Sequence, residues 1–438
     1  MSSAIEPFVI NVPDSQLEDL QTRLSMARFP VELALSPGQE WSYGTPEQKV
    51  RELVHHWRTT FDWRKIESEI NAQLPQFVTE VDSGSEDHGK LKVHFVHRKS
   101  RRRNASPLLF IHGWPGNFLE VSKIISQLVE PTNTNDPAFH VVAPSLPGYC
   151  FSEASMKPGL DLKVTAYMFN ELMNKLGYKS YIAQGGDWGA MLIRGLAIWH
   201  PECCKGVHTN MFVTHPPTPL RSPFKLFKLI VGFLGLAVGW PIWYSAEELE
   251  PLKNVQQFVD EETGYLELQS RKPQVRIHSS SYSPVGLLGW MYEKLHGWTD
   301  DYPWTNDEIL TWVMLYWIPG PVGSVRYYKE SVRVTDWRTY CLKTWSPVPM
   351  GVSVFPKELF VPPHDWAEMV GPVIFYKRHK SGGHFAAWER LVAYAFHHAP
   401  SRSSSIYFNR PNQLIDDIQR FTEKLLVTSP GLFDESCT

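Results

Sequence analysis

Residues 181–196, YIAQGGDWGAMLIRGL, restrict the fold of this chain more than any other stretch. An apolar run leads into a glycine-rich turn and then into a helical pattern, and Asp187 stands on the turn between Gly186 and Gly189. Small residues on both sides of one polar residue are typical of a nucleophile elbow, a strained turn that holds a side chain in a cleft. The usual residue at this point is Ser, so a carboxylate here indicates a different chemistry.

Strand and helix patterns alternate from residue 107 onward, around this turn. PLLFIHG and FHVVAPS are typical of strands, and FLEVSKIISQLVE and VTAYMFNELMNKLGY of helices. Repeated βα units predict a mostly parallel sheet with helices on both faces and a site at the carboxyl ends of the strands. The alternation stops near residue 215 and resumes at MGVSVFP. We therefore expect an α/β fold whose core, residues 101–214 and 345–438, carries a helical cap inserted at 215–344. An N-terminal meander, residues 1–100, precedes the core.

One segment of the expected cap is unusually apolar. Residues 226–243, LFKLIVGFLGLAVGWPIW, are nearly long enough to span a bilayer, but Lys228 and Pro241 interrupt them. We expect a buried or cleft-lining segment of the cap. A surface that contacts a membrane is the alternative.

Charge and composition narrow the classes of partner. The net charge of −3 gives no reason to expect a nucleic-acid partner. The five cysteines fit neither a zinc site nor a CxxC motif, so we expect free thiols in a reducing compartment. The N-terminal residues contain no apolar signal region, which favours a cytoplasmic protein without a stable membrane span. The oligomeric state, including a homodimer, stays open.

The carboxylate of Asp187 suits one kind of reaction. An aspartate with an ordinary pKa of about 4 is anionic at neutral pH and needs no base to attack. It suits displacement at a saturated carbon that carries a leaving group, such as an epoxide or an alkyl halide. The product is an ester on the enzyme, which water must cleave with the help of a base. His384 in GGHFAAWE follows a late predicted strand and is the expected base.

Two further groups are needed for the cleavage of the ester. An acid that orients the imidazole should follow a strand between nucleophile and base. Glu358 and Asp365 both qualify, and Glu358 lies nearer to the strand end. The oxyanion should be bound by the backbone N–H groups of Trp188 and of Trp114 in HGWPG. The peptide bond between Trp114 and Pro115 is a candidate cis bond.

Together these motifs resemble epoxide hydrolases of the microsomal type, including their soluble microbial relatives. PDSQLEDLQTRL and FDWRKIESEIN resemble the N-terminal region of that family, HGWPG, GGDWG and GGHFAAWE its core, and SPVGLLGWMYEK and RYYKE its cap. The resemblance implies an α/β-hydrolase fold and the hydration of an epoxide to a vicinal diol. It also implies a small apolar epoxide and water as partners, and neither a metal nor an organic cofactor.

The resemblance also assigns roles to individual residues. It implies Asp187 as nucleophile, His384 as general base and Glu358 as the acid partner of the histidine. It implies two tyrosines that protonate the epoxide oxygen, Tyr265 in GYLELQ and Tyr328 in RYYKE, with Tyr327 as the neighbouring alternative.

One stretch departs from the family pattern. Residues 390–409, RLVAYAFHHAPSRSSSIYFN, resemble added sequence and begin six residues after His384, where they could disturb the base. A catalytically impaired binding protein on the same scaffold is therefore one alternative. A hydrolase like haloalkane dehalogenases, which share an aspartate at the elbow, is the other.

Overall fold

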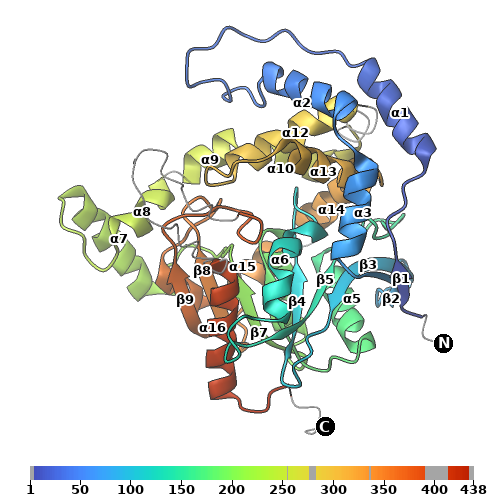
Figure 1. Cartoon of the computed structure of the whole chain (residues 1–438). Coiled ribbons are helices and arrows are strands. Elements are labelled where there is room, and N and C mark those ends of the chain that lie inside the picture. Colours follow the sequence, from blue (N-terminus) through green and yellow to red (C-terminus); the bar gives the residue numbers. More distant parts are fainter. Residues whose placement is uncertain (1–3, 254, 276–282, 335–336, 390–412, 434–438) are drawn as a thin grey trace, which may run out of the picture.

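The computed structural model describes residues 4–253, 255–275, 283–334, 337–389 and 413–433. The strands of this part of the chain form one nine-stranded sheet in the order β1-β2-β3-β5-β4-β6-β7-β8-β9 (Figure 1). The pairs from β1 to β5 are antiparallel, and those from β5 to β9 are parallel. The strands are β1 Glu6–Phe8, β2 Gln76–Asp82, β3 Lys90–Arg98, β4 Ser106–Ile111, β5 Phe139–Pro144, β6 Tyr181–Gly185, β7 Cys204–Thr209, β8 Met350–Val354 and β9 Val373–Arg378.

Helices lie between the strands of the sheet, follow the last strand and form the large insertion after β7. Those outside the insertion are α1 Asp14–Ser25, α2 Glu47–Thr59, α3 Trp63–Gln73, η1 Phe118–Lys123, α4 Ile125–Val129, α5 Leu162–Lys175, α6 Trp188–Trp199, η3 His364–Met369 and α16 Gln413–Thr428. Those between β7 and β8 are α7 Pro223–Ala237, α8 Ala246–Lys253, α9 Val255–Glu261, α10 Gly264–Arg271, α12 Pro284–Gly297, α13 Asn306–Trp317, α14 Val322–Lys329, η2 Glu330–Val334 and α15 Trp337–Lys343.

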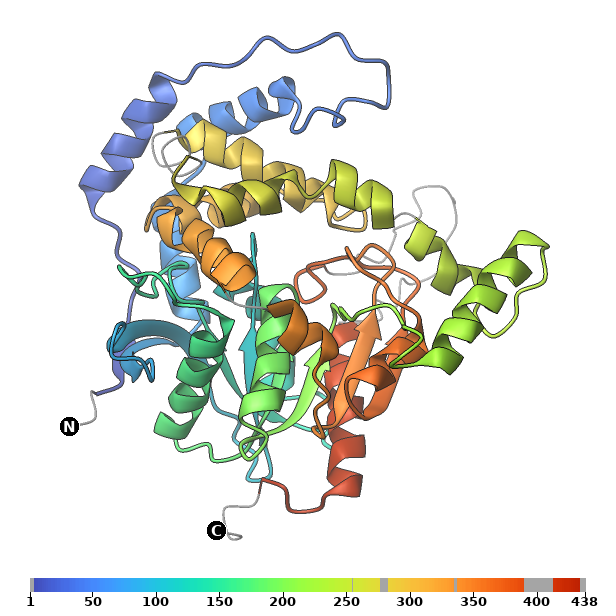
Figure 2. The same cartoon turned by 180° about the vertical axis from the view of Figure 1, so that it is seen from behind.

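The centre of the sheet is covered on both faces. Every residue of β4, β6 and β8 is buried, as expected for parallel strands that lie between two layers of helices. Helices α5 and α6 lie on the face that is toward the viewer in Figure 2, and α16 lies on the opposite face (Figure 1). The predicted mostly parallel sheet with helices on both faces is therefore confirmed.

One predicted helix is wrong in detail. FLEVSKIISQLVE was expected to form a single amphipathic helix, but the chain forms the 3-10 turn η1 and then the short helix α4. The side chain of Asn117 accepts a hydrogen bond from the N–H of Leu119, and the N–H of Ile124 donates to the carbonyl of Val121. These local bonds tighten the first turns and separate them from α4.

The described part of residues 215–344 is helical and contains no strand, as predicted. Its helices α10, α12, α13 and α14 lie above the carboxyl ends of the parallel strands, and α2 lies against them from the N-terminal segment (Figure 1). The hydroxyl of Thr45 donates to the carbonyl of Gly289 over 2.8 Å, and Trp41 stacks on His296 at 3.7 Å between ring centroids. The N-terminal segment therefore holds the helical insertion from its outer side.

The expected burial of residues 226–243 is wrong. Most of this segment forms α7 and the turn after it, which project at the edge of the molecule (Figures 1 and 2). Within α7 only Gly232 and Gly235 are buried. Among the described residues, no helix has both the length and the apolar character needed to cross a bilayer.

A buried polar network fastens the last helix to the sheet. Asp417 of α16 is completely buried and accepts hydrogen bonds from Lys377 at 2.8 Å and from Ser353 at 2.5 Å. Its other contact is with Nε2 of His379 at 2.5 Å, and Ser353 in turn contacts His208 at 3.1 Å. A buried carboxylate needs such partners, so they fix the position of α16 on β8 and β9. The predicted insertion at 390–409, which precedes this helix, lies outside the described residues.

Candidate active site

Asp187 lies on a strained turn between β6 and α6. Its φ of 50° and ψ of −126° are unusual for a residue with a side chain, and such strain is concentrated at functional sites. The turn brings the backbone of α6 against β4, since a Cβ on Gly189 would lie 2.1 Å from the carbonyl oxygen of Ile111. Only glycine fits there. The backbone thus has the sharp turn that the sequence predicted.

Three side chains from three strand ends meet at this turn. His384, after β9, places Nε2 3.5 Å from Oδ2 of Asp187 and Nδ1 2.6 Å from Oε1 of Glu358, after β8. The side chains of His384 and Glu358 are 2% exposed, and that of Asp187 is 15% exposed. A parallel bridge between Lys357 and Gly383 joins the two loops that carry Glu358 and His384. The arrangement is a line of carboxylate, imidazole and carboxylate.

Asp365, the other acid that the sequence offered, lies elsewhere. It is buried, but its carboxylate accepts hydrogen bonds from Lys228 at 3.0 Å and from Tyr244 at 2.9 Å. Lys228 belongs to α7, and Tyr244 follows the turn after that helix. The structure therefore brings Glu358, and not Asp365, to His384.

The two carboxylates control the charge of the imidazole between them. Burial alone would lower the pKa of His384, because it disfavours the charged form. The negative charge of Glu358 and the hydrogen bond to Asp187 together outweigh burial and hold that pKa well above its usual value. With both carboxylates ionised, the imidazole carries a proton at neutral pH.

The HGWPG loop provides a donor to the carboxylate on the elbow. The backbone N–H of Trp114 donates to Oδ1 of Asp187 over 2.8 Å, and the bond between Trp114 and Pro115 is cis, as predicted. A Cβ on Gly113 would lie 2.1 Å from the same Oδ1, so this close approach requires glycine. Trp188, whose N–H was the second expected donor, directly follows Asp187 as the first residue of α6.

His112 shapes this loop as a neutral side chain. Burial lowers its pKa to about 4, so the ring is uncharged at neutral pH. Its Nε2 lies 3.2 Å from the N–H of Leu146 and must accept from it, which leaves the proton on Nδ1 to donate to the carbonyl of Gly113 at 2.9 Å. The imidazole thereby connects the loop before Trp114 to the loop after β5.

The two tyrosines implied by the resemblance lie together beside Trp114. Tyr265 of α10 stacks on Trp114 with 5.3 Å between ring centroids, and Tyr328 of α14 meets the same ring edge-on at 6.0 Å. The rings of the two tyrosines are 6.2 Å apart. Burial, and after it the charge of Asp187, raises the pKa of both hydroxyls well above the usual value for tyrosine. Both phenols therefore keep their protons at neutral pH.

Tyr327 is oriented differently from its neighbour. Its hydroxyl contacts that of Thr165 in α5 at 3.2 Å, although its ring also lies near Trp188. Tyr328 packs on Trp188 at 4.8 Å and on Trp114. The structure thus brings Tyr328, and not the hydroxyl of Tyr327, toward the elbow.

Sequence reasoning missed a set of contacts between the His384 loop and the helical insertion. The N–H of His384 donates to the carbonyl of Trp298 over 2.9 Å, and that of Gly382 donates to the Asp300 carboxylate over 2.8 Å. In return the N–H of Asp300 donates to the carboxylate of Glu389 over 3.0 Å. We call these three bonds the base clamp. Glu389 stands in the GGHFAAWE motif, but nothing in the sequence points to its partner 89 positions earlier.

Sequence reasoning also missed Glu120, a carboxyl group that faces the HGWPG loop. A Cβ on Gly116 would lie 1.7 Å from its Oε1. Burial raises the pKa of Glu120 to about 8, and the negative charges of Asp187 and Glu358 act in the same direction. The group is therefore mostly protonated at neutral pH and adds little negative charge to a site that already holds two carboxylates.

Comparison with known proteins gives a consistent result. The family model described as the epoxide hydrolase N terminus matches residues 5–121, and the one described as the alpha/beta hydrolase fold matches residues 106–229. Epoxide hydrolase 1 of Sus scrofa is 34% identical over 411 residues, which cover 88% of this chain and 86% of the relative.

Solved structures agree with these matches over nearly the whole chain. The Aspergillus niger epoxide hydrolase is 30% identical with a TM-score of 0.78, and the match covers 97% of each chain. The juvenile hormone epoxide hydrolase of Bombyx mori is 28% identical with a TM-score of 0.81, and covers 97% of this chain and 96% of the silkworm enzyme. The similarity to these relatives agrees with the aspartate on the elbow and the two tyrosines beside it. The chain belongs to the epoxide hydrolase family of α/β-hydrolase enzymes.

Proposed function

We propose that this enzyme opens an epoxide ring with the carboxylate of Asp187 and then hydrolyses the resulting ester with a water activated by His384. The observation that carries this proposal is the line from Glu358 through His384 to Asp187, with 2.6 Å and 3.5 Å between the contacting atoms. The phenols of Tyr265 and Tyr328, whose rings both pack against Trp114, supply the acids that ring opening needs.

In the first step, an oxygen of Asp187 bonds to one carbon of the epoxide, and the bond from that carbon to the ring oxygen breaks. The ring oxygen takes a proton from Tyr265 or Tyr328 and becomes a hydroxyl group, so no free alkoxide has to leave. The phenolate regains a proton from the solvent, which receives one from His384 once the ester has formed. The product is a hydroxyalkyl ester of Asp187.

Ester formation also changes the base. The ester of Asp187 is neutral, so one of the two negative charges that hold the pKa of His384 high disappears. The pKa of the imidazole then falls toward the range in which it can accept a proton. The attack of the nucleophile thus prepares His384 for the second step.

In the second step, His384 takes a proton from a water molecule while the water oxygen bonds to the ester carbonyl carbon. The backbone N–H of Trp114, already 2.8 Å from Oδ1 of Asp187, would stabilise the negative oxygen that forms, together with the N–H of Trp188. The bond between the acyl carbon and the diol oxygen then breaks. The diol oxygen receives the proton from His384, and the carboxylic acid left on Asp187 gives its proton to the imidazole 3.5 Å away, so that Asp187 returns to its carboxylate form.

We propose small apolar epoxides as the substrates. Aromatic rings surround the phenols, since Tyr265 packs on both Trp114 and Trp298 at 5.3 Å between ring centroids. Residues 215–344 would act as the cap that covers the bound epoxide. A cytoplasmic setting is supported by Cys150, Cys203, Cys204 and Cys341, which are all free thiols.

The proposal is tested with two variants of the nucleophile and the base. In Asp187→Ala, both diol formation and the protein adduct should disappear. In His384→Gln, the ester should still form and then persist, so mass spectrometry of the intact protein should detect enzyme plus one epoxide. His55→Gln, an exposed histidine of α2, is the control and should turn over normally. Diol formation by Asp187→Ala at the normal rate would rule out the covalent mechanism.

A further inference from the structure

Helix α7 presents a continuous apolar face to the solvent. Five residues spaced by three or four positions have exposed side chains, which places them on one side of the helix. They are Phe224, Phe227, Ile230, Leu234 and Val238, with exposed fractions from 51% to 78%. Large exposed apolar surfaces on a protein mark sites of contact with another molecule or with a membrane.

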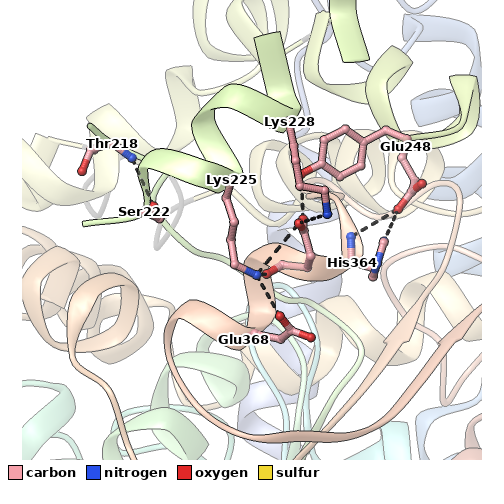
Figure 3. A network of polar contacts seen from close by, with 9 residues as sticks. Thr218, Ser222, Lys225, Lys228, Glu248, His364 and Glu368 are labelled. Atoms are coloured by element: carbon pink, nitrogen blue, oxygen red, sulfur yellow. Dashed lines mark hydrogen bonds and ion pairs between the residues drawn. The ribbon is translucent and has the colours of Figure 1, made fainter. Parts of the chain in front are cut away.

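The charged side of the same helix points toward the body of the protein. Lys225 donates to the carboxylate of Glu368 over 2.8 Å and to the backbone carbonyl of Asp365, and Lys228 donates to the carboxylate of Asp365 over 3.0 Å (Figure 3). A surface helix of a globular protein ordinarily shows its charges to water and its apolar side to the core. In α7 the lysines instead bind to the body of the protein, and these ion pairs leave one apolar side of the helix facing outward.

The turn after α7 enlarges the apolar face. A Cβ on Gly235 would lie 2.5 Å from the carbonyl of Trp240, so the turn folds back closely on the helix. Trp240 is 76% exposed and Trp243 is 49% exposed. The ring of Trp243 lies 5.7 Å from that of Phe227, which joins the turn to the helix. We call the exposed side chains of α7 and of this turn the α7 face.

We propose that the α7 face binds to the surface of a lipid bilayer that contains anionic lipids. Residues 216–245 include no Asp or Glu and three basic residues, of which Arg221 is exposed beside the start of the helix. Exposed tryptophans next to an apolar helix face are typical of segments that lie at the level of the lipid headgroups. Because Lys225 and Lys228 are ion-paired with Glu368 and Asp365, the exposed Arg221 is the cation of this segment that complements an anionic membrane surface.

The shape of the segment fits a bilayer surface. The α7 face stands on a projecting edge of the molecule (Figures 1 and 2), where a flat surface can reach it. A helix of 15 residues is roughly 22 Å long at about 1.5 Å per residue, so it suits a helix that lies in the interface. Since Lys225 and Lys228 stay bound to Asp365 and Glu368, the enzyme would keep its fold while the outer side chains enter the lipid.

The test is flotation of the full chain with vesicles of phosphatidylcholine, with and without one third phosphatidylserine. The parent protein should float with the anionic vesicles. Phe227→Glu/Leu234→Glu should bind at least about tenfold more weakly, because two large apolar side chains no longer enter the lipid. A matched control, Met156→Glu/Val427→Glu, changes two exposed apolar residues elsewhere and should bind like the parent.

Further measurements separate lipid binding from other causes. Arg221→Glu should weaken binding to the anionic vesicles only. Sedimentation velocity and hydrolysis of a water-soluble epoxide should be the same for the α7 variant and the parent, since the changed side chains are exposed. Failure of the parent to float would overturn the proposal. It would also be overturned if the parent were a dimer that Phe227→Glu/Leu234→Glu converts to a monomer, because the α7 face would then be an interface between two copies.

Discussion

Replacement of Glu358 by Gln should separate the two chemical steps. The Nδ1 atom of His384 lies 2.6 Å from the Glu358 carboxylate, and both side chains are 2% exposed. In the proposed second step a neutral imidazole becomes positively charged as it takes a proton from water. The charge of Glu358 therefore stabilises the transition state of hydrolysis, whereas the attack of Asp187 on the epoxide does not require a base.

The size of the effect follows from the burial of this pair. Removal of one partner of a buried ion pair costs about 3–5 kcal/mol. The amide of Gln keeps a hydrogen-bond acceptor and removes only the charge, so we expect the lower part of that range. At about 1.4 kcal/mol per factor of ten, ester hydrolysis should slow by roughly 10²–10³.

Rapid-quench kinetics with mass spectrometry of the intact protein measures both steps. In Glu358→Gln the ester should form at nearly the normal rate and then accumulate to almost one per enzyme molecule. Asp365→Asn is the matched control, because it removes the charge of a buried carboxylate that contacts Lys228 and Tyr244 instead of His384. The reasoning would be refuted if Asp365→Asn accumulated the ester and Glu358→Gln did not.

Three further predictions concern the nucleophile, the proton donors and a buried histidine. In a single turnover in H2¹⁸O, the label should appear in the carboxylate of Asp187 and not in the diol, and a labelled diol would indicate direct attack of water. Tyr265→Phe/Tyr328→Phe should slow ester formation by roughly 10²–10⁴, the usual contribution of a general acid, whereas Tyr327→Phe should have little effect; equal rates for the double variant and the parent in rapid-quench experiments would contradict the assignment. Burial lowers the pKa of His208 to about 4 from an ordinary 6.5, so the stability that depends on the neutral ring is complete above pH 6.5 and is lost as the pH falls toward 4. This amounts to about 2 kcal/mol by pH 5. The free energy of unfolding, measured with urea at both pH values, should therefore fall between pH 7 and pH 5 by about 2 kcal/mol less in His208→Gln than in the parent.

The parts of the site that the sequence predicted are those with local patterns. Asp187 is marked by glycines within two positions on each side, and only a sharp turn explains that spacing. The proximity of Glu358 and His384 follows from topology, because both come after parallel strands whose carboxyl ends share one edge of the sheet. The cis bond before Pro115 could likewise be predicted, because HGWPG places a proline in a tight turn.

The parts that could not be predicted depend on contacts between distant segments. The apolar composition of α7 suggested burial. However, Lys225 and Lys228 form ion pairs with Asp365, which turn their side of the helix toward the protein and leave an apolar side exposed. No pattern within residues 226–243 indicates this partner. The base clamp joins residues 382–389 to residues 298–300 through backbone N–H groups that donate to one backbone carbonyl and to two carboxylates. No local pattern in either segment indicates its partner, because the two lie more than 80 positions apart.

The base clamp ties the histidine loop to the helical insertion that we propose covers the substrate. If the covering helices lift to admit an epoxide or release a diol, the bonds from His384 to Trp298 and from Gly382 to Asp300 must stretch or break. The loop that carries the imidazole would then lose its hydrogen bonds to the helical insertion. An open molecule would be a poor catalyst of water attack, and closure would restore the hydrolytic half of the cycle together with the shelter around the ester.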